Sequence, residues 1–246
     1  MNNPKKNVCI VGGGMGSLSA AIYLNKKGFD VSIHEKNSTL GGRANIIEEN
    51  GFKFDVGPSL LNYPWIFENL FKEAGEEMRE HIDLIEIDSG VKFLWDDKET
   101  FTITSDFPKL SNEIARLEKS HINGLNSFLK INSRRYNTAF EKLLNKNLDN
   151  PVRWGTGLGA KELFSGSMFK SMYKDLGAHF KSRHIKEAFG SYAMYLGGSP
   201  FKIPGFFSIL PYGEIAYGLW MPKGGIYSLI EKLEEILIKI GVKIYK

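Results

Sequence analysis

The sequence predicts an α/β protein: a parallel sheet that starts with a βαβ unit, with a domain of mixed α and β structure inserted into it. Residues 7–35 have the pattern of a strand, a glycine-rich turn, a helix and a second strand. Residues 91–103 instead alternate apolar and polar around a charged turn, which predicts an antiparallel hairpin. This change of pattern divides the chain into a first domain over 1–88, an inserted domain over 89–215, and a return to the first domain over 216–246.

The βαβ unit begins with the apolar run from Val8 to Val11, which has the composition of a strand buried on both faces. Cys9, the single cysteine of the chain, lies in this run, and we expect it to be a small buried side chain. A helix is predicted from Met15 to Lys27, with Gly28 as its C-terminal cap. Residues 31–34 alternate as the second strand.

The glycines between the first strand and the helix predict a site for a diphosphate. Gly12 allows a tight turn, and Gly14, which has no Cβ, lets the anion approach the backbone at the positive end of the helix. Glu35 follows Gly14 by 21 residues, close to the spacing expected of an acid that binds ribose hydroxyls. Ser17 replaces the third glycine of the motif but is small enough for close helix–strand packing. The alternative is an ordinary βαβ turn that binds nothing.

The other elements of the first domain flank the insertion. Residues 65–74 read as a helix and residues 84–87 as a short strand. After the insertion, residues 227–240 form a regular amphipathic pattern, and residues 242–245 begin another strand. These elements would complete the sheet and cover it with helices.

The inserted domain is predicted to be mostly helical. Residues 109–147 indicate two helices separated near 121–124. Residues 164–180 carry aromatic and methionine side chains at helical spacing, flanked by lysines. They form either a helix that faces the core, which is the commoner case, or an interfacial helix whose aromatic face enters lipid. The proline-punctuated apolar run 201–212 either lines a substrate tunnel or packs the domain.

Composition limits the classes of function. The 246 residues are 42% hydrophobic and 24% charged, which is ordinary for a globular protein. The net charge of +4 comes from scattered lysines, so we expect no nucleic-acid partner. No apolar run approaches the length of a membrane-spanning helix, and the N-terminus has no secretory pattern. We expect a cytoplasmic protein, with peripheral contact to the inner face of the cell membrane left open.

Three further stretches carry a resemblance to a known family. Residues 40–44 read LGGRA, residues 51–59 read GFKFDVGPS, and residues 220–226 read WMPKGGI. Together with the glycine turn, they resemble in order and spacing the phytoene desaturase (carotenoid desaturase) family of the FAD-dependent amine oxidase superfamily. The resemblance covers most of the chain. In that superfamily the chain continues for roughly as long again, so the resemblance implies an N-terminal portion and a fold truncated at its C-terminus.

The resemblance implies a Rossmann-like FAD-binding domain, with the insertion as a domain that faces substrate and membrane. It implies an oxidoreductase that removes hydride from a carotenoid-like polyene and forms C=C bonds, with FAD carrying the chemistry. It implies the following cofactor contacts: Gly12, Gly13, Gly14, Met15, Gly16 and Ser17 at the pyrophosphate, Glu35 at the adenosine ribose, Lys36 at the adenine, Gly42 and Arg43 at the flavin side of the diphosphate, and Gly57, Pro58 and Ser59 by the isoalloxazine ring.

Several alternatives stay open at this level. Arg43 could form only a surface salt bridge, Gly57-Pro58 could be only a turn, and Asp55 could be a structural hydrogen-bond acceptor. No catalytic acid or base is identified, and the five histidines lack metal-ligand spacing, so no metal is expected. The chain could instead be another amine oxidase-type flavoenzyme, a carotenoid isomerase, or an inactive or split N-terminal fragment whose C-terminal half is encoded separately.

Overall fold

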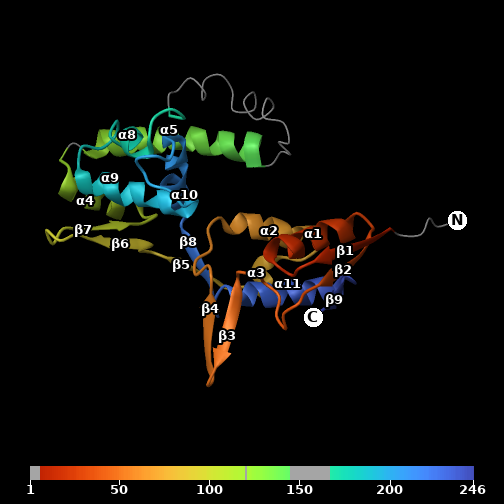
Figure 1. The fold of residues 1–246 in the computed structure, drawn as a ribbon. Coiled ribbons are helices and arrows are strands. Elements are labelled where there is room, and N and C mark those ends of the chain that lie inside the picture. Colours follow the sequence, from red (N-terminus) through yellow and green to blue (C-terminus); the bar gives the residue numbers. More distant parts are fainter. Residues whose placement is uncertain (1–5, 120, 145–166) are drawn as a thin grey trace. The chain divides into compact units, whose positions relative to one another are not determined.

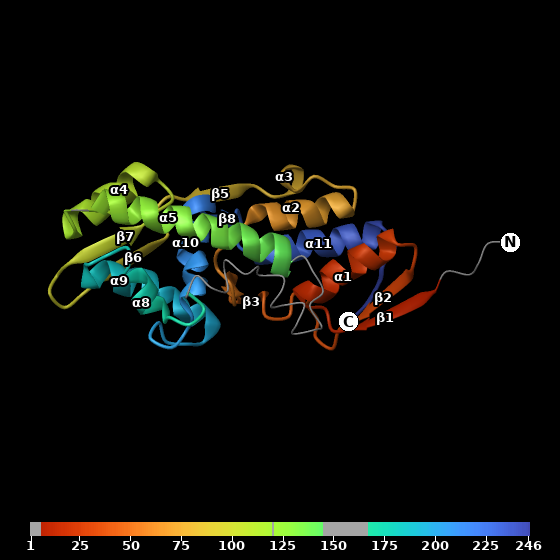
Figure 2. The same cartoon turned by 90° about the horizontal axis from the view of Figure 1, so that it is seen from above.

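The chain folds into two compact units, each with its own core (Figures 1 and 2). The computed structural model describes residues 6–119, 121–144 and 167–246. Unit 1 comprises Met1–Ile87 with Leu219–Lys246, and unit 2 comprises Asp88–Gly218. Unit 1 is therefore built from both ends of the chain, and unit 2 is the insertion.

Unit 1 contains a three-stranded parallel sheet in the order β1-β2-β9. Strand β1 (Asn7–Val11) pairs with β2 (Asp30–His34), and β2 pairs with β9 (Lys243–Tyr245). Helix α1 (Met15–Lys26) connects β1 to β2, as the glycine-rich pattern predicts. The predicted Rossmann-like βαβ unit is confirmed.

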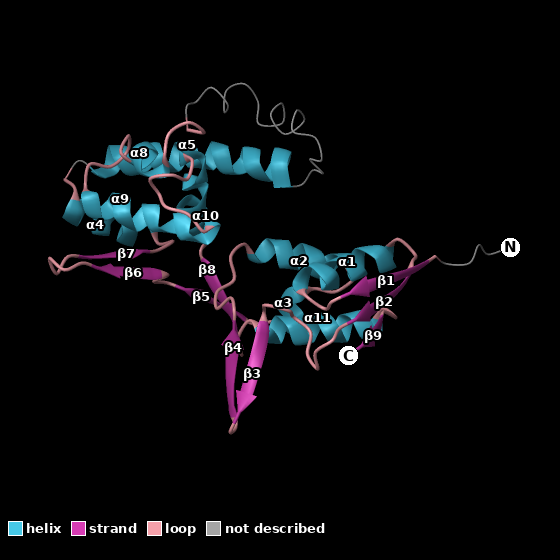
Figure 3. Cartoon of the chain, viewed as in Figure 1, coloured by secondary structure: helices cyan, strands magenta, loops and turns pink. Residues whose placement is uncertain are grey.

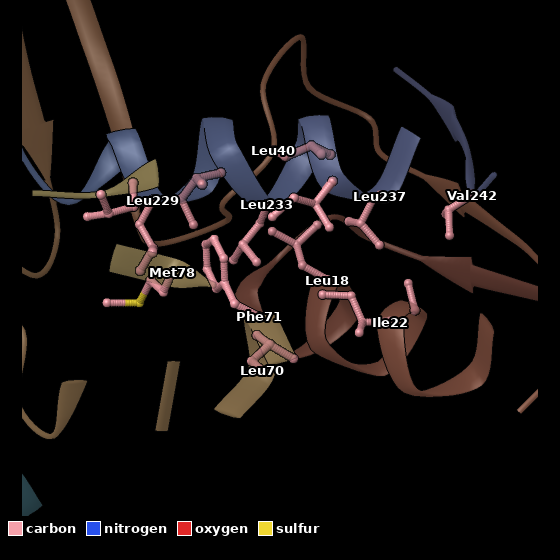
Figure 4. Packing of buried hydrophobic residues seen from close by; sticks show 14 of the residues in the cluster. Leu18, Ile22, Leu40, Leu70, Phe71, Met78, Leu229, Leu233, Leu237 and Val242 are labelled. Carbon is pink, nitrogen blue, oxygen red and sulfur yellow. The ribbon is translucent and has the colours of Figure 1, made fainter. Parts of the chain in front are cut away.

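Helices cover one face of this sheet. The two nearest are α1 and α11 (Tyr227–Lys239), and α2 (Pro64–Glu73) and the short α3 (Met78–His81) complete the layer. Figure 4 shows Leu18 of α1 beside Leu233 and Leu237 of α11, and all three side chains are fully buried. The helix periodicities 15–27, 65–74 and 227–240 therefore identify this core correctly.

The other face of the sheet carries no covering layer among the described residues. Cys9 is exposed and Val11 is 85% exposed, whereas Ile10 is half-buried against the helices. The predictions of a strand buried on both faces and of a buried Cys9 are therefore wrong. An apolar run does not by itself indicate how many layers pack against a strand. Here the odd-numbered residues of β1 point away from the single helical layer.

Unit 1 also contains two antiparallel pairs. Strands β3 (Asn45–Glu49) and β4 (Phe52–Val56) form a hairpin that extends from the rest of the unit (Figure 3). Its turn is Asn50-Gly51, with both residues at positive φ (51° and 83°), as a type I′ turn requires. The Asn-Gly pair is a hairpin signal in the sequence that the predictions above do not include. Strand β5 (Leu84–Ile87) pairs with β8 (Leu219–Pro222).

Unit 2 begins with the predicted hairpin of β6 (Val91–Leu94) and β7 (Thr100–Ile103). Helices α4 (Phe107–Leu117) and α5 (His121–Thr138) follow, and α5 continues as a π-helical stretch over Ala139–Leu144. The break between the two helices comes just before 121–124, not within it. Gly124 lies inside α5, and a Cβ there would meet the carbonyl oxygen of His179 at 2.2 Å, so the glycine allows the backbone at His179 to approach the helix closely.

The rest of unit 2 consists of short helices. They are α8 (Met172–Leu176), α9 (Arg183–Gly190), the 3₁₀ helices η2 (Ser191–Leu196) and η3 (Gly205–Ser208), and α10 (Ile209–Tyr217). Met172, Leu176 and Phe180 are buried, which supports the core alternative for this region. Phe169 is 85% exposed, so it does not belong to that core, and Phe164 lies outside the described residues.

No helix in the part of the chain that the structure describes is both long and apolar enough to span a bilayer.

Candidate functional site

The candidate site lies where β1 turns into α1. Gly12 has φ +93°, and its N–H donates to the carbonyl oxygen of His34 at 2.8 Å, so the turn depends on a residue without a Cβ. Gly14 is the N-cap residue of α1, with φ −74°, and no side chain caps the helix there. No acidic residue lies in the first turn of α1. The positive end of the helix dipole is therefore not neutralised by a carboxylate of its own helix.

Glu35 is held against the glycine turn from the end of β2. Its Oε2 accepts the N–H of Gly13 at 2.6 Å, and its Oε1 accepts the N–H of Asn37 at 2.9 Å. The hydrogen bond from Gly13, and then that from Asn37, lowers the pKa of the Glu35 carboxyl, because both favour the ionised form. Glu35 thus places a negative, hydrogen-bond-accepting group directly beside the turn.

The Gly-Gly-Arg stretch packs against the same turn. The N–H of Gly41 donates to the carbonyl oxygen of Gly13 at 2.8 Å. A Cβ on Gly42 would lie 3.2 Å from Cα of Gly14, and a Cβ on Gly13 would lie 2.4 Å from Cδ2 of the buried Leu40. The two segments therefore lie so close together that a Cβ on Gly13 or Gly42 would force its neighbour to move. Gly41 was not predicted as a site residue, although it stands within the recognised LGGRA stretch.

A cleft of about 640 Å³ opens beside these segments. Gly57 joins it from the end of β4, at φ +115°, where a Cβ would lie 2.0 Å from the carbonyl oxygen of Arg43. The conformation of Gly57 is thus that of a turn, but of a turn that forms a wall of the cleft. The residues that line the cleft are Gly14, Met15, Gly16, Gly41, Arg43, Ala44, Gly57 and Pro58.

The other predicted site residues do not line the cleft. Gly12, Gly13, Gly42 and Glu35 shape its edge through the contacts above, and the N–H of Ser17 donates to the carbonyl oxygen of Gly14 at 2.9 Å within α1. Lys36 and Ser59 are exposed outside the cleft lining.

Arg43 is exposed at the cleft and is not part of a surface salt bridge with any described residue. Its guanidinium thus remains available to an anion in the cleft. Among the described residues, no carboxylate lies within ion-pair distance of the Arg43 guanidinium.

The stretch 220–226 contacts the stretch 51–59 through Asp55. The Oδ2 atom of Asp55 accepts the N–H of Ile226 at 2.6 Å, and its Oδ1 atom accepts the N–H of Tyr227 at 3.2 Å. Asp55 therefore caps α11, which confirms its structural alternative. Gly225 has φ +94°, and a Cβ on it would lie 2.2 Å from Oδ2 of Asp55. The motifs at 51–59 and 220–226 thus form one contact that joins the two ends of the chain.

In the described residues, no cluster of three or more His, Cys, Asp or Glu side chains is arranged to hold a metal ion. His184 instead contacts Asp97 at 2.8 Å, and His179 contacts Ser127 at 3.1 Å.

Comparison with known proteins identifies the family. Residues 10–74 match the model of the NAD(P)-binding Rossmann-like domain. The chain is 29% identical over 240 residues to the zeta-carotene-forming phytoene desaturase of Myxococcus xanthus, covering 98% of this chain and 46% of that protein. It is 32% identical over 235 residues to the phytoene desaturase of Phycomyces blakesleeanus, covering 95% of this chain and 40% of that protein. The chain matches an N-terminal portion of proteins of the phytoene desaturase family.

The chain spans about half the length of these curated relatives. Among solved structures, putrescine oxidase bound to putrescine has a TM-score of 0.58 to this chain at 15% identity, covering 98% of this chain and 51% of that one. At this identity the likeness shows the fold alone, which is that of the predicted Rossmann-like domain with an insertion. The match to a dinucleotide-binding domain and the similarity to desaturases together imply FAD as the dinucleotide.

The residues around the cleft fit such a dinucleotide. A Cβ on Gly14 would meet no protein atom within 4 Å, so the space beside the start of α1 is open. The uncapped helix end and the guanidinium of Arg43 suit a diphosphate, and the carboxylate of Glu35 suits a ribose hydroxyl. The cleft therefore combines an open helix end, a cation and a carboxylate, which are groups that a dinucleotide could use.

Proposed function

We propose that this chain is the FAD-binding and substrate-facing portion of an oxidoreductase that removes hydride from a carotenoid-like polyene and forms C=C bonds. The observation that carries the proposal is the open, uncapped N-terminus of α1 at Gly14, with the carboxylate of Glu35 fixed beside it. The family of the chain supports the reaction class and the polyene substrate.

In this proposal the residues divide the cofactor among them. The backbone from Gly12 to Ser17 binds the diphosphate, Glu35 binds the adenosine ribose, and Lys36 lies at the adenine. Gly42 and Arg43 bind the flavin side of the diphosphate. Gly57, Pro58 and Ser59 lie by the isoalloxazine ring. FAD, when bound, supplies the hydride acceptor.

The protein's own contribution would be to bind, orient and exclude water. A polyene has no charged group, so its binding would depend on apolar walls rather than on a catalytic acid or base. No catalytic residue is assigned. The run 201–212, whose Phe206 is buried and whose Phe201 is exposed, remains a candidate for such a wall.

Two other activities share these cofactor residues. An amine oxidase-type flavoenzyme would need a pocket for a polar amine, and a carotenoid isomerase would use the same polyene. Turnover assays separate them: a new double bond shifts polyene absorption to the red, an isomerase leaves the number of double bonds unchanged, and an amine oxidase releases peroxide from amines.

We also propose that the complete enzyme needs a C-terminal half, either in the same chain or encoded separately. The exposed sheet face at Cys9 and Val11 supports this, because parallel sheets are normally covered on both faces. Without that half, the 246-residue chain would have little activity of its own. The coding sequence next to that of this chain is the direct test, because a following frame with the missing half would favour a split enzyme.

The test of the cofactor site is Gly14→Ala. Gly14 has a negative φ and open space around a Cβ, so the fold tolerates alanine, whereas a bound diphosphate would meet the new methyl group. Purified wild-type chain should show flavin absorption bands. Gly14→Ala should keep the melting temperature of the ligand-free chain but lose flavin.

The matched control is Ser19→Ala, in the same helix but outside the cleft lining, and it should retain flavin. Wild-type flavin content in well-folded Gly14→Ala would contradict the proposed diphosphate position. Absence of flavin from a folded wild-type chain that contains both halves would overturn the proposed function itself.

A further inference from the structure

A buried carboxylic acid lies in unit 2, outside the lining of the cofactor cleft. Glu214 belongs to α10 and is only 5% exposed. Within the part of the chain that the structure describes, neither of its carboxyl oxygens forms a hydrogen bond. A buried polar group without a partner costs free energy, and most such groups in folded proteins have one. Glu214 therefore needs a partner that the described residues do not supply.

The surroundings of Glu214 favour its neutral form. Burial raises the pKa of the Glu214 carboxyl, and the nearby hydroxyl group of Tyr192 opposes this effect only in part. A neutral carboxyl carries a proton that it can donate, and a carbonyl oxygen is a suitable acceptor for it. A pure hydrocarbon offers no such atom. The chemistry of this position therefore selects a ligand that carries an oxygen atom.

Tyrosine side chains connect Glu214 with the surface of unit 2. The ring of Tyr192 lies 5.6 Å from that of Tyr195 in an edge-to-face arrangement, and Tyr195 is 61% exposed. The pKa of Tyr195 is raised, first by partial burial and then by the nearby carboxyl of Glu214. The buried acid thus lies beside a residue that reaches solvent, which is where a ligand would enter.

A cluster of aromatic rings (Tyr136, Phe140, Tyr212 and Tyr217) lies at the end of the same helix. Tyr217 follows Glu214 by three residues, so the two lie on the same side of α10. The ring of Tyr136 in α5 lies 5.1 Å from that of Tyr217 and 5.7 Å from that of Tyr212. Phe140 extends this ring cluster, with its ring 4.3 Å from that of Tyr136. Flat rings of this kind suit the π system of a conjugated chain.

The helix that carries two of these rings is irregular at the same place. It is α-helical as far as Thr138 and π-helical over Ala139–Leu144. Stretches of π-helix are rare in proteins and frequently lie at functional sites. The irregular stretch begins between Tyr136 and Phe140, so it coincides with the ring cluster.

We propose that Glu214 binds the carbonyl oxygen of a conjugated polyene aldehyde whose chain packs against the ring cluster. The inference rests on the proposed function for the polyene and deepens it, because it names an end-oxygenated substrate. The acid supplies a hydrogen bond and the rings supply apolar contact. A hydrocarbon of the same length would make only the apolar contact, so the aldehyde should bind more tightly.

Binding of two matched polyenes to the purified chain tests the proposal. The probes are a polyene aldehyde and a polyene hydrocarbon with the same number of conjugated double bonds, both delivered from detergent micelles. Quenching of tryptophan fluorescence measures the two dissociation constants. Wild type should bind the aldehyde about tenfold more tightly, which is what one buried hydrogen bond contributes. The absorption of the bound aldehyde should also shift to the red.

Variants of Glu214 isolate the hydrogen bond from the different partition of the two probes into micelles. Glu214→Leu should lose the preference for the aldehyde, whereas Glu214→Gln, whose amide N–H can still donate, should keep part of it. Glu214→Leu should melt at or above the temperature of wild type, because it removes a buried polar group that has no described partner. The control is Glu80→Leu in α3, an exposed glutamate of unit 1, which should keep the full preference.

Equal affinity of wild type for the two probes, or a preference that survives in Glu214→Leu, would overturn the proposal. A large loss of stability in both Glu214→Leu and Glu214→Met would also overturn it, since the acid would then have a partner within the chain. The assay needs neither flavin nor turnover. A chain that prefers the aldehyde but never binds FAD would therefore refute only the proposed function, and a flavin-containing desaturase without this preference would refute only the site at Glu214.

Discussion

The buried ion pair of unit 2 gives the sharpest prediction about stability. Other ion pairs in the described part of the chain, such as Lys26–Glu73, lie at the surface. The side chains of Arg135 and Asp175, in contrast, are only 8% and 10% exposed. Arg135 Nη1 binds Asp175 Oδ2 at 2.6 Å and Asn132 Oδ1 at 3.1 Å, and it lies 3.4 Å from the carbonyl oxygen of Gly205. The pair therefore joins α5 to α8 and to the start of η3.

Asp175→Asn removes the negative charge with almost no change of shape. The guanidinium of Arg135 then stays buried without its counter-ion, and breaking such a pair costs about 3–5 kcal/mol. For a chain of this size a loss of 3 kcal/mol lowers the melting temperature by about 6–12 °C. Urea titration followed by far-ultraviolet circular dichroism measures the free energy of unfolding directly.

Two further variants isolate the cause. In the double variant Arg135→Met/Asp175→Asn neither charge remains, so it should be less destabilised than the sum of the two single variants. Glu73→Gln removes the Lys26–Glu73 pair, which is as short (2.5 Å) but 56% and 34% exposed, and it should cost less than about 1 kcal/mol. The reasoning fails if Asp175→Asn costs no more than Glu73→Gln, because burial would then not decide the strength of these pairs.

Two other predictions follow from the first unit. Gly225→Ala should destabilise the chain by at least about 1 kcal/mol more than Gly51→Ala. Both glycines have positive φ, but a Cβ on Gly225 would lie 2.2 Å from Oδ2 of Asp55, whereas a Cβ on Gly51 would meet no atom within 4 Å. Equal losses in urea titration would show that the neighbours of Gly225 move to admit the methyl group. Glu35→Gln should flatten the acid side of the stability–pH profile. The folded pKa of Glu35 lies below its ordinary value of 4.5, so its contribution is present above that value and is lost as pH falls through the folded pKa. An unchanged acid limb in the variant would mean that the hydrogen bonds from Gly13 and Asn37 do not persist in solution.

Much of the candidate site could be predicted from local sequence, because its geometry is local. A strand, a turn at positive φ and a helix end are each set by a few adjacent residues, and Gly12 and Gly14 have the conformations that their pattern predicts. Glu35 lies beside Gly13 because the two strands of a βαβ unit are neighbours in register. The recognised stretches also predicted the lining residues Arg43 and Gly57.

Sequence by itself therefore determined the βαβ unit, the glycine turn and the resemblance to phytoene desaturases. Only the tertiary structure decided which faces of the sheet in unit 1 are covered. The alternation of side chains in a strand predicts that Cys9 and Val11 share one face of the sheet, but whether that face is buried depends on a second layer packing against it. In the same way, a helical repeat could not separate the buried Met172 from the exposed Phe169, because the helix begins only after Phe169. The hydrogen bonds from Ile226 and Tyr227 to Asp55 also needed the fold, since they join residues whose separation along the chain leaves no local signal.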